Sequence, residues 1–231
     1  MRAADFDQII VVDIETTGLG PGARPVEVAW IQVDHDLNEI ARAGSLVNPG
    51  IPIEPGASAV NGITDAMVAK SPTLEHLVRS IHGDPFAAGH TLVIAHNAPF
   101  DYPHFAPFFD TSESLCTMRL ARHILADFDN YRLDTLCTHL GLSGTQDHRA
   151  MGDTEMCLAL MKHLTDHHED GIDGLLALSA SALSEMTMPF GKHKNTPIAD
   201  LPPDYVKWMR SEMDGLNGDL LACLDLHHPS A

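Results

Sequence analysis

Asp13 and Glu15 are two carboxylates at the end of an apolar run, in the sequence QIIVVDIET. The β-branched residues of that run predict a buried strand, and a spacing of two places both carboxylates on one face of it. Two anions side by side attract a cation. Because carboxylates are hard oxygen ligands, the ion that we expect is Mg²⁺ or Mn²⁺ rather than zinc. Solvated acids at a strand end show the same pattern, so other residues must decide between the two interpretations.

A third carboxylate, Asp101, lies in the segment HNAPFD, which directly follows the apolar run LVIA. A polar cluster between a strand and a helix is typical of ligand sites in α/β sheets, which collect at the carboxyl ends of strands. We expect Asp101 in the first turn of the helix, where its side chain can face the sheet edge. The alternative is an aspartate that only stabilises the helix dipole.

A fourth carboxylate, Asp153, follows His148 in the segment DHRAMGD, where a loop runs into a long predicted helix. Asp153 lies inside that helix and is fixed by it, whereas His148 lies before the helix or at its start. This arrangement suits a rigid metal ligand and a titratable imidazole that moves a proton. Considered alone, His148 is one of 15 histidines, and a surface position is the simpler interpretation.

The elements that must position these residues begin with three predicted strands, at residues 8–14, 26–33 and 41–47. Their connections are too short for a helical crossover, which predicts an antiparallel meander. A short buried strand follows at residues 92–95. Apolar residues at helical spacing predict helices at residues 63–68, 73–81, 99–109, 117–125, 132–140 and 149–163. Strands first and alternation later predict an α/β fold, in which a mixed sheet is flanked by helices.

A change of composition divides the chain near its C-terminus. The sequence DGIDGLLALSASALSE, rich in small residues, follows the last long helix, and aromatic residues and lysines gather after it. We therefore predict a first domain at residues 1–168, a linker at residues 169–185 and a small C-terminal module at residues 186–231.

Together, the motifs follow the order DxE, NxxFD and HRAxxD along a chain of βββαβα topology. Over about residues 8 to 165 this resembles the DEDDh family of 3′→5′ exonucleases, the DnaQ-like branch of the RNase H-like fold. The resemblance implies that Asp13, Glu15, Asp101 and Asp153 hold two divalent cations, Mg²⁺ or Mn²⁺, which stabilise the attacking and the leaving oxygen at phosphorus. It also implies that His148 is the general base, which takes a proton from the attacking water. The product would be a nucleoside 5′-monophosphate.

The resemblance extends to a pocket for the terminal nucleotide. Thr16 and Leu19, in the sequence ETTGL, would contact the 3′-hydroxyl and wedge against the terminal base. Ile63 would support this contact, and Asn97 and Phe100 would shape the site. An amide that closes a turn and a ring that is buried are equally good explanations of Asn97 and Phe100.

The C-terminal segment contains FGKHK and then DYVKW, which resembles the small module of exodeoxyribonuclease X-like proteins. Lysines beside aromatic residues suit single-stranded DNA, which is bound by backbone attraction and base stacking. We expect Lys192 and Lys194 to contact DNA. Tyr205 and Trp208 are three residues apart on a predicted helix, and this spacing favours core packing for Trp208.

The charge of the chain bears on its partners. Lys and Arg number 14 against 32 Asp and Glu, a formal net charge of −18. Residues 1–185 carry 10 basic and 26 acidic groups, and residues 186–231 carry 4 and 6. Because proteins that grip phosphates usually have an excess of cations, this surface disfavours long duplex. Four acids that hold two dications would form a locally neutral site, so recognition is expected at the last few nucleotides.

Composition excludes other classes of protein. With 44% hydrophobic and 20% charged residues, the chain has the composition of an ordinary soluble globular protein. The four cysteines match no metal-binding or disulfide pattern, which favours a reducing cytoplasm. No apolar run is long enough to cross a membrane, so we expect no membrane partner.

The sequence thus predicts a 3′→5′ exodeoxyribonuclease that acts on single-stranded or frayed 3′ ends of DNA, with a role in DNA repair. Three alternatives stay open: an RNA-directed exonuclease of the same fold, the proofreading subunit of a polymerase, and a nonenzymatic nucleic-acid adaptor whose acids hold structural ions. The sequence does not decide whether the chain forms a homodimer.

Overall fold

Two compact units make up the chain, Met1–Ala177 and Leu178–Ala231. The computed structural model describes residues 1–20, 22–80, 89–109, 111–125, 128, 130–142, 149–181, 186–213, 216 and 218–229. The division lies inside the segment predicted as a linker, where the described residues include helix α8 (Gly171–Ser179).

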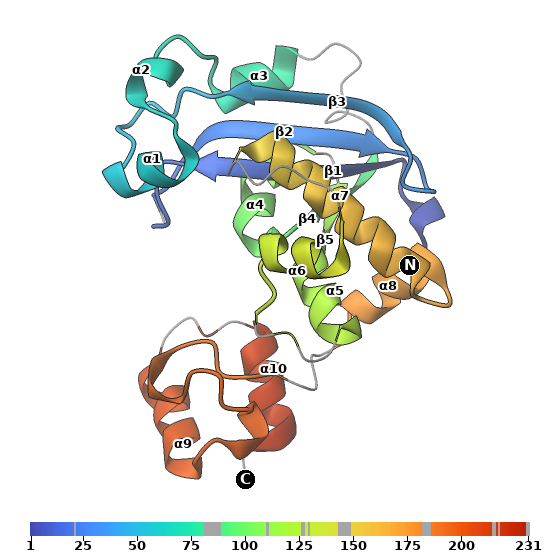
Figure 1. Cartoon of the computed structure of the whole chain (residues 1–231), viewed down its shortest axis with the longest axis vertical. Coiled ribbons are helices and arrows are strands. Elements are labelled where there is room, and N and C mark those ends of the chain that lie inside the picture. The colour runs from blue at the N-terminus through green and yellow to red at the C-terminus, as the bar shows by residue number, and fades with distance from the viewer. Residues whose placement is uncertain are drawn as a thin grey trace. The chain divides into compact units, whose positions relative to one another are not determined.

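Five strands of the first unit form one sheet, in the order β3-β2-β1-β4-β5 (Figure 1). Strands β1, β2 and β3 pair antiparallel, which confirms the predicted meander, whereas β4 pairs parallel with both β1 and β5. The predicted mixed sheet is therefore confirmed. The strands span Gln8–Thr16 (β1), Pro25–Val33 (β2), Glu39–Leu46 (β3), His90–Ala95 (β4) and Thr111–Cys116 (β5).

Strand β5 is an addition to the predicted set. Its sequence, TSESLC, lacks an apolar run, and only Leu115 is buried along it. Because β5 lies at the edge of the sheet, its other side chains stay partly or fully exposed and need not be apolar. A pattern of hydrophobic residues could not find a strand of this kind.

The predicted helices of the first unit are confirmed, with ends that differ by a few residues. The segment predicted at 63–68 forms a single turn, and α1 is an additional short helix. A 3₁₀ turn at Ala106–Phe108 completes the segment predicted at 99–109, and another lies at Ala3–Asp5. The helices before α8 span Pro55–Asn61 (α1), Asp65–Val68 (α2), Leu74–Ser80 (α3), Ala98–Phe105 (α4), Thr117–Ile124 (α5), Leu133–Leu140 (α6) and Ala150–Asp166 (α7).

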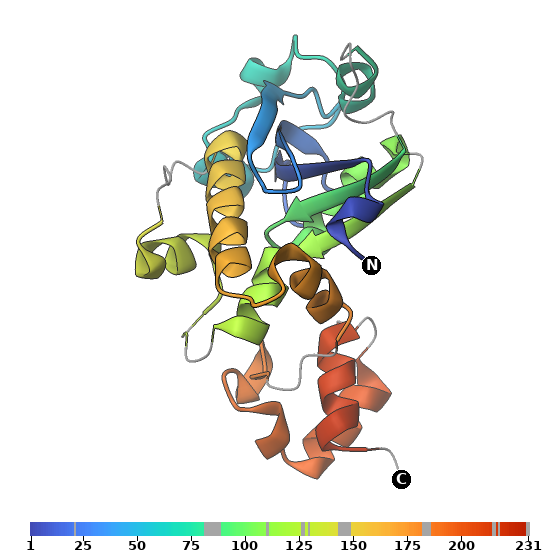
Figure 2. The same ribbon diagram turned by 90° about the vertical axis from the view of Figure 1, so that its right-hand side faces the viewer.

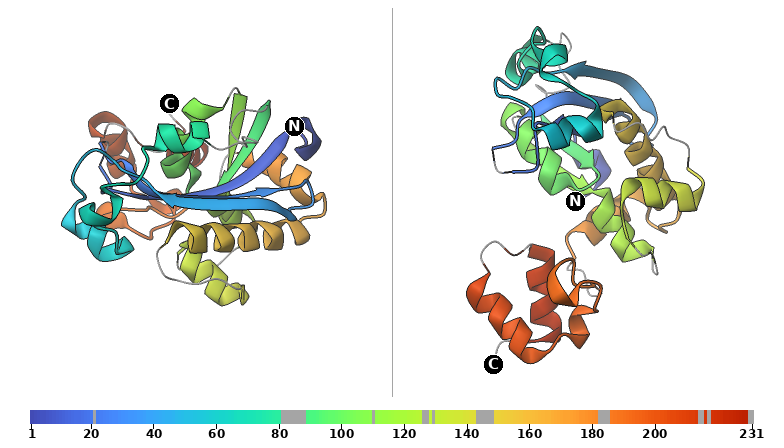
Figure 3. Two further views of the ribbon diagram at one scale, coloured as in Figure 1. Left: turned by 90° about the horizontal axis from the view of Figure 1, so that it is seen from above. Right: turned by 60° about the vertical axis from the view of Figure 1, so that its left-hand side comes forward.

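Helices cover both faces of the sheet. On one face, Ile10, Val12 and Ile14 of β1 belong to a buried cluster with residues of α3 and α4, such as Val78 and Phe105. Helix α7 packs on β1 and β2 (Figure 2), and a view along the sheet shows α7 and α3 on opposite sides of these strands (Figure 3, left). Side chains alternate along a strand, so the residues of β1 that lie between Ile10, Val12 and Ile14 point to the opposite face of the sheet, which α7 covers.

The second unit has a core of its own. Helices α9 (Pro203–Glu212) and α10 (Gly218–His227) pack with two 3₁₀ turns, Gly191–His193 and Ile198–Asp200. A short antiparallel bridge joins Thr187 to Pro197. The buried side chains that fill this core are Met188, Ile198, Leu201, Val206, Met209, Leu220, Cys223 and Leu224.

The structure also bears on two expectations from composition. All four cysteines are free thiols, in line with the absence of a disulfide pattern. Among the described residues, no helix has both the length and the apolar character that a membrane span requires.

Candidate active site

Three carboxylates from distant parts of the sequence meet beside the sheet. Asp13 and Glu15 lie near the carboxyl end of β1 and Asp153 in the first turn of α7, and one oxygen of each lies within 4.8 Å of the others. The spacing of two in β1 therefore places both acids toward α7, as expected. Each of the three side chains is partly accessible to solvent.

A glutamate of the neighbouring strand fixes the start of α7. Glu27 of β2 accepts hydrogen bonds from Arg149 Nε, at 2.8 Å, and from the backbone N–H of Ala150, at 3.1 Å. Arg149 Nη2 forms an ion pair with the same carboxylate. Glu27 also lies opposite Glu15 in the register of the two strands. These contacts with Glu27 hold the first turn of α7 against β2, the strand beside β1. Asp153 therefore lies next to Asp13 and Glu15.

The fourth predicted ligand, Asp101, lies in the first turn of α4 and is 3% exposed. Strands β1 and β4 are parallel, so the loop after β4 emerges at the same edge of the sheet as the end of β1. An interaction with the backbone of Ile14 lowers the pKa of Asp101, but burial, the larger effect, raises it. Asp101 is close enough for its charge to act on Asp13, although it lies outside the group of three oxygens within 4.8 Å.

The electrostatics of this cluster favour a bound cation. Burial, followed by the charges of Asp101, Asp153 and Glu15, raises the pKa of Asp13 well above its ordinary value. Burial likewise raises the pKa of Glu15 to about 7 and that of Asp101 to about 8. Interactions with the Asn61 side chain and with the Arg149 charge lower the pKa of Glu15, but they do not cancel the effect of burial.

Carboxylates that are partly or fully buried and repel one another fit a hard divalent cation, which neutralises them. The donor set holds no thiolate or imidazole among the described residues of the cluster, and this chemistry suits an ion such as Mg²⁺ or Mn²⁺.

His148 falls in the segment 143–148, which lies outside the described residues. Arg149, the next residue, is the N-cap of α7. The role of His148 as general base therefore stays a prediction.

The residues after β1 differ in their surroundings. Thr16 is buried, and its hydroxyl donates a hydrogen bond to the carbonyl oxygen of Gly18 at 2.6 Å. Leu19 is 90% exposed, which leaves its side chain accessible to a ligand.

Ile63 requires a correction. It is fully buried in a small cluster with Val26, Ile53 and Val68, so its side chain offers no surface to a substrate. The Ile63 side chain packs in the core of the protein instead, and its backbone N–H donates a hydrogen bond to Asn61 Oδ1 at 3.0 Å.

Asn97 and Phe100 lie at the start of α4. Asn97 is exposed and has a left-handed backbone with φ of 68°, so it forms the turn between β4 and the helix. Phe100 is half-buried and packs against the cluster that covers one face of the sheet.

Two positioning residues of the site were not predicted. Glu27 is one acid in the otherwise apolar strand PVEVAWIQV, and such a buried charge is a detectable sign of a structural partner. Asn61, at 4% exposure, donates to the carbonyl oxygen of Thr16 at 3.5 Å and accepts from the N–H of Ile63 at 3.0 Å. The Asn61 side chain also lowers the pKa of Glu15, so it acts on the acid cluster as well as on this loop.

In the second unit, the prediction of core packing for Trp208 is wrong, because the side chain is 47% exposed. The buried pair of α9 is Val206 and Met209, which lie one residue further along the helix. Lys192 and Lys194 are exposed, and Lys192 Nζ lies over the Tyr205 ring.

Comparison with known proteins identifies the class. Residues 10–161 match a family model described as Exonuclease, of the RNase T type. The chain therefore belongs to this DnaQ-like exonuclease family, and its five-stranded mixed sheet is the RNase H-like fold of that family. The family depends on divalent metal ions, in keeping with the acidic cluster.

The chain is similar over most of its length to a curated protein and to a solved structure. Exodeoxyribonuclease 10 of Escherichia coli strain K12 is 28% identical over 217 residues, which are 91% of this chain and 94% of that protein. The solved structure of Exonuclease X in complex with 5′ overhanging duplex DNA has a TM-score of 0.59 and 29% identity, and the match covers 72% of this chain and 98% of that one.

The DNA polymerase III subunit epsilon-like protein of Rhodobacter capsulatus is 38% identical over 160 residues, 63% of this chain but 22% of that protein.

The second unit has a match of its own. Residues 179–225 match a family model named after a proposed quorum-sensing-regulated virulence factor.

Proposed function

We propose that the chain is a metal-dependent 3′→5′ exodeoxyribonuclease, which hydrolyses the terminal phosphodiester of DNA and releases a nucleoside 5′-monophosphate. The observation that carries the proposal is the convergence of Asp13, Glu15 and Asp153, with oxygens within 4.8 Å of one another, beside the buried carboxylate of Asp101. Acids from three separate stretches of the chain meet at the carboxyl ends of the strands, and such a cluster can hold the divalent cations that assist hydrolysis of a phosphodiester.

The residues that would hold the metal are Asp13, Glu15, Asp101 and Asp153, and we propose two ions, Mg²⁺ or Mn²⁺. When bound, divalent cations stabilise the charge that develops on the oxygens around phosphorus. The protein contributes ligands whose positions are fixed. Glu27 and Asn61 hold α7 and the loop after β1, so the carboxylates need little rearrangement when a cation binds.

Further residues of the chain would act on water and on the substrate. In this proposal the oxygen of water bonds to the terminal phosphorus as the 3′-oxygen of the preceding nucleotide leaves. His148 accepts the proton of that water as the bond forms. Thr16 lies beside the terminal sugar, and the exposed Leu19 wedges against the terminal base.

The names of the relatives favour DNA as the substrate class. The relatives reported above are named as an exodeoxyribonuclease and as a polymerase III epsilon-like protein, and the solved relative is a complex with duplex DNA that has a 5′ overhang. The net charge of −18 also disfavours long duplex, so we propose that recognition is concentrated at the 3′ end, where dications offset the acids. A cytoplasmic location and a role in repair are parts of the same proposal.

A proofreading role is the second candidate, because polymerase III proteins are among the relatives. The length of the matches favours an independent exonuclease. The alignment with Exodeoxyribonuclease 10 spans 91% of this chain and thus extends beyond the first unit, which ends at Ala177. Following this match, we propose that the two units correspond to the exonuclease domain and the C-terminal module predicted from the sequence.

The experiment uses oligonucleotides of one sequence, as DNA and as RNA, labelled at the 5′ end. With Mg²⁺, we expect the labelled DNA to shorten in single-nucleotide steps, nucleoside 5′-monophosphates to accumulate, and chelator to stop the reaction. RNA that is degraded faster than DNA would replace the proposed substrate with the RNA alternative. Failure to cleave DNA with either Mg²⁺ or Mn²⁺, or immediate loss of the 5′ label as a mononucleotide, would overturn the proposal.

A further inference from the structure

Helix α9 of the second unit has two different sides. Val206 and Met209 are buried in the core of that unit, whereas Trp208 is 47% exposed and Tyr205 is half-buried. An exposed tryptophan is uncommon in a small unit with a complete core, because a large apolar ring is stabilised by burial. Its exposure is not a consequence of poor packing, since the core side of α9 is filled by other residues.

Tyr205 and Trp208 stack on one another, and the His193 ring packs on Tyr205 at a tilt of 58°. The centres of the Tyr205 and Trp208 rings lie 5.4 Å apart, at an interplanar angle of 27°. The centre of the His193 ring, which belongs to the turn at Gly191–His193, lies 4.5 Å from that of Tyr205. Lys192 Nζ lies 5.1 Å from the centre of the Tyr205 ring. This combination of parallel aromatic faces and a neighbouring cation is the composition that proteins use to bind single-stranded nucleic acid.

The rings border a hollow of about 480 Å³, lined by Gly191, Lys192, Asp204, Tyr205 and Trp208. Gly191 has a φ of 74°, and a Cβ atom at this position would lie 2.9 Å from the Tyr205 hydroxyl oxygen. A glycine thus permits the turn of residues 191–193 to approach the aromatic side of α9. The volume is in the range of small-molecule sites and accommodates one or two nucleobases.

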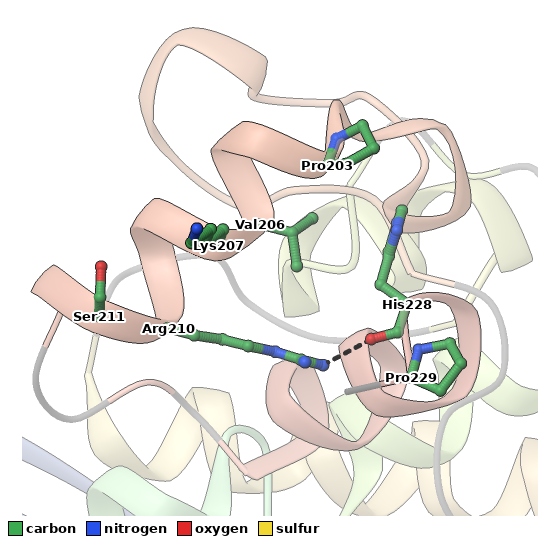
Figure 4. A pocket seen from close by; sticks show the side chains of 7 residues that line it. All are labelled: Pro203, Val206, Lys207, Arg210, Ser211, His228 and Pro229. Atoms are coloured by element: carbon green, nitrogen blue, oxygen red, sulfur yellow. Dashed lines mark hydrogen bonds between the residues drawn. The ribbon is translucent and has the colours of Figure 1, made fainter. Parts of the chain in front are cut away.

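A second hollow on α9 provides a contrast. It has a volume of about 540 Å³ and includes Lys207 and Arg210, but it holds no aromatic ring apart from His228 (Figure 4). Arg210 donates to the Asp225 carboxylate at 2.7 Å and to the carbonyl oxygen of His228 at 2.9 Å. Its guanidinium is therefore engaged within the unit, whereas Trp208 presents its ring outward.

We propose that the hollow beside Trp208 is a stacking site for nucleobases of single-stranded DNA, at which the strand that the enzyme degrades is held. The inference rests on the proposed function and adds a binding site in the second unit. Charge supports this occupant: residues 186–231 carry 4 basic and 6 acidic groups, against 10 and 26 in residues 1–185. A polyanion is repelled least by this part of the chain.

The lining residues divide the contacts. The ring of Trp208 stacks on a base, and Lys192 attracts the backbone phosphate that follows it. Asp204 disfavours phosphate at its own position and can accept a hydrogen bond from an exocyclic amino group of a base. The site accepts bases of every kind, because each offers a face for stacking.

The test measures binding of a fluorescently labelled 20-nucleotide oligo-dT to the full chain in chelator, by fluorescence anisotropy. Chelator prevents hydrolysis, and it leaves the acids of the first unit without cations, so binding there is disfavoured. We expect Trp208→Ala to weaken binding about tenfold, since one stacked base contributes roughly 1–3 kcal/mol. Trp208→Phe retains a ring and should bind within about twofold of the wild type.

The matched control is Leu226→Ala, which removes an exposed apolar side chain (57% exposed) from α10, away from the residues that line the hollow. Its affinity should equal that of the wild type, and circular dichroism of all variants should be unchanged. Binding by Trp208→Ala that equals the wild type, or an equal loss in Leu226→Ala, would overturn the stacking site. An enzyme that still degrades DNA in Mg²⁺ after such a result keeps its proposed function, so the two proposals fail separately.

Discussion

The acid cluster of the first unit and the aromatic hollow of the second unit are built in opposite ways. In the cluster, buried carboxylates repel one another and gain stability from a cation. In the hollow, the neutral ring of Trp208 is exposed and that of Tyr205 lies beside Lys192, so no bound cation is needed to balance charge there. Chemistry at phosphorus needs charges held in fixed positions, whereas binding a strand of any sequence needs open, sequence-tolerant surfaces.

The comparison predicts that the two regions respond to different changes. Substitutions in the cluster should abolish hydrolysis and alter metal binding, and substitutions in the hollow should weaken binding of long single strands. The following predictions test the cluster side of this comparison, from the largest expected effect to the smallest.

Replacement of Asp13 by Ala should lower kcat for DNA by about a thousandfold or more. Asp13 lies within 4.8 Å of Glu15 and Asp153 by its carboxylate oxygen, and burial, followed by the charges of the other acids, raises its pKa well above the ordinary value. Loss of a metal ligand removes several kcal/mol of charge stabilisation in the transition state. Release of mononucleotides under saturating Mg²⁺ measures the effect.

The control for this variant is Glu169→Ala, which removes an exposed acid of the same unit. It should retain the activity of the wild type. Equal activity of the Asp13 variant would disprove the assignment of the cluster as the active site, provided that circular dichroism shows a folded protein.

Replacement of Glu27 by Gln should lower kcat about 10-fold to 100-fold, with little change in KM for DNA. The variant keeps the size of the side chain but loses the charge that holds Arg149 and the start of α7. Residues that orient metal ligands commonly have effects of this size. Steady-state kinetics on an oligonucleotide separate kcat from KM.

Metal affinity distinguishes positioning from general destabilisation in this variant. Glu27→Gln should bind Mn²⁺ more weakly, and Glu27→Asp should recover part of the affinity. Glu39→Gln on β3, which breaks an exposed ion pair with Arg42, is the matched control and should behave as the wild type. An unchanged Mn²⁺ affinity in Glu27→Gln would show that Glu27 does not position the cluster.

Replacement of Leu19 by Ala should slow degradation of blunt duplex about threefold to fivefold and leave single strands nearly unaffected. The side chain is 90% exposed, and its wedge against the terminal base would contribute about 1 kcal/mol by burial of apolar surface. Initial rates on the two substrates provide the ratio. Equal slowing on both would argue against a wedge.

The metal-free protein should lose thermal stability as the pH rises from about 4.5 to about 8. Folding raises the pKa of Glu15 to about 7 and that of Asp101 to about 8, so in this range the folded chain binds protons that the unfolded chain has released. Stability is therefore greatest at the acid end of the range and declines with pH. The decline should amount to several degrees Celsius in Tm, at roughly 2–4 °C for each kcal/mol.

Saturating Mg²⁺ should remove most of this decline, because the cation compensates the ionised acids. Asp101→Asn in chelator should show a shallower decline than the wild type, which separates the cluster from the repulsion of the remaining surface charges. A Tm that rises with pH in chelator would contradict the direction of the shifts.

Much of the fold could be predicted because its strands and helices have clear apolar periodicity. Three apolar runs with short connections were enough to predict the meander. Apolar residues at helical spacing were enough to predict α7. Strand β5 could not be predicted, because a polar edge strand has no such pattern and forms through its pairing with β4. Periodicity also could not show which side of α9 is buried, since Tyr205/Trp208 and Val206/Met209 have the same spacing.

The convergence of Asp13, Glu15 and Asp153 could be predicted from residue type and order, because carboxylates near strand ends and helix starts are the oxygen ligands that suit a hard divalent cation. The isolated acid Glu27 indicates a partner, but the partners of Glu27 and Asn61 could not be predicted, since their hydrogen bonds join segments far apart in the sequence. Ile63 shows the reverse error, in which a residue beside the site belongs to the core. The contact partners of a side chain, and hence such roles, come from the tertiary structure.

The most direct test of the account is the binding of Mn²⁺, measured by electron paramagnetic resonance, to the wild type, to Asp153→Asn and to the control Glu169→Gln. If carboxylates of β1 and α7 share a cation, the wild type and the control will bind Mn²⁺ with the same affinity, and Asp153→Asn will lose a tight site. Equal Mn²⁺ binding by all three proteins would contradict the central claim that these distant acids form one metal centre.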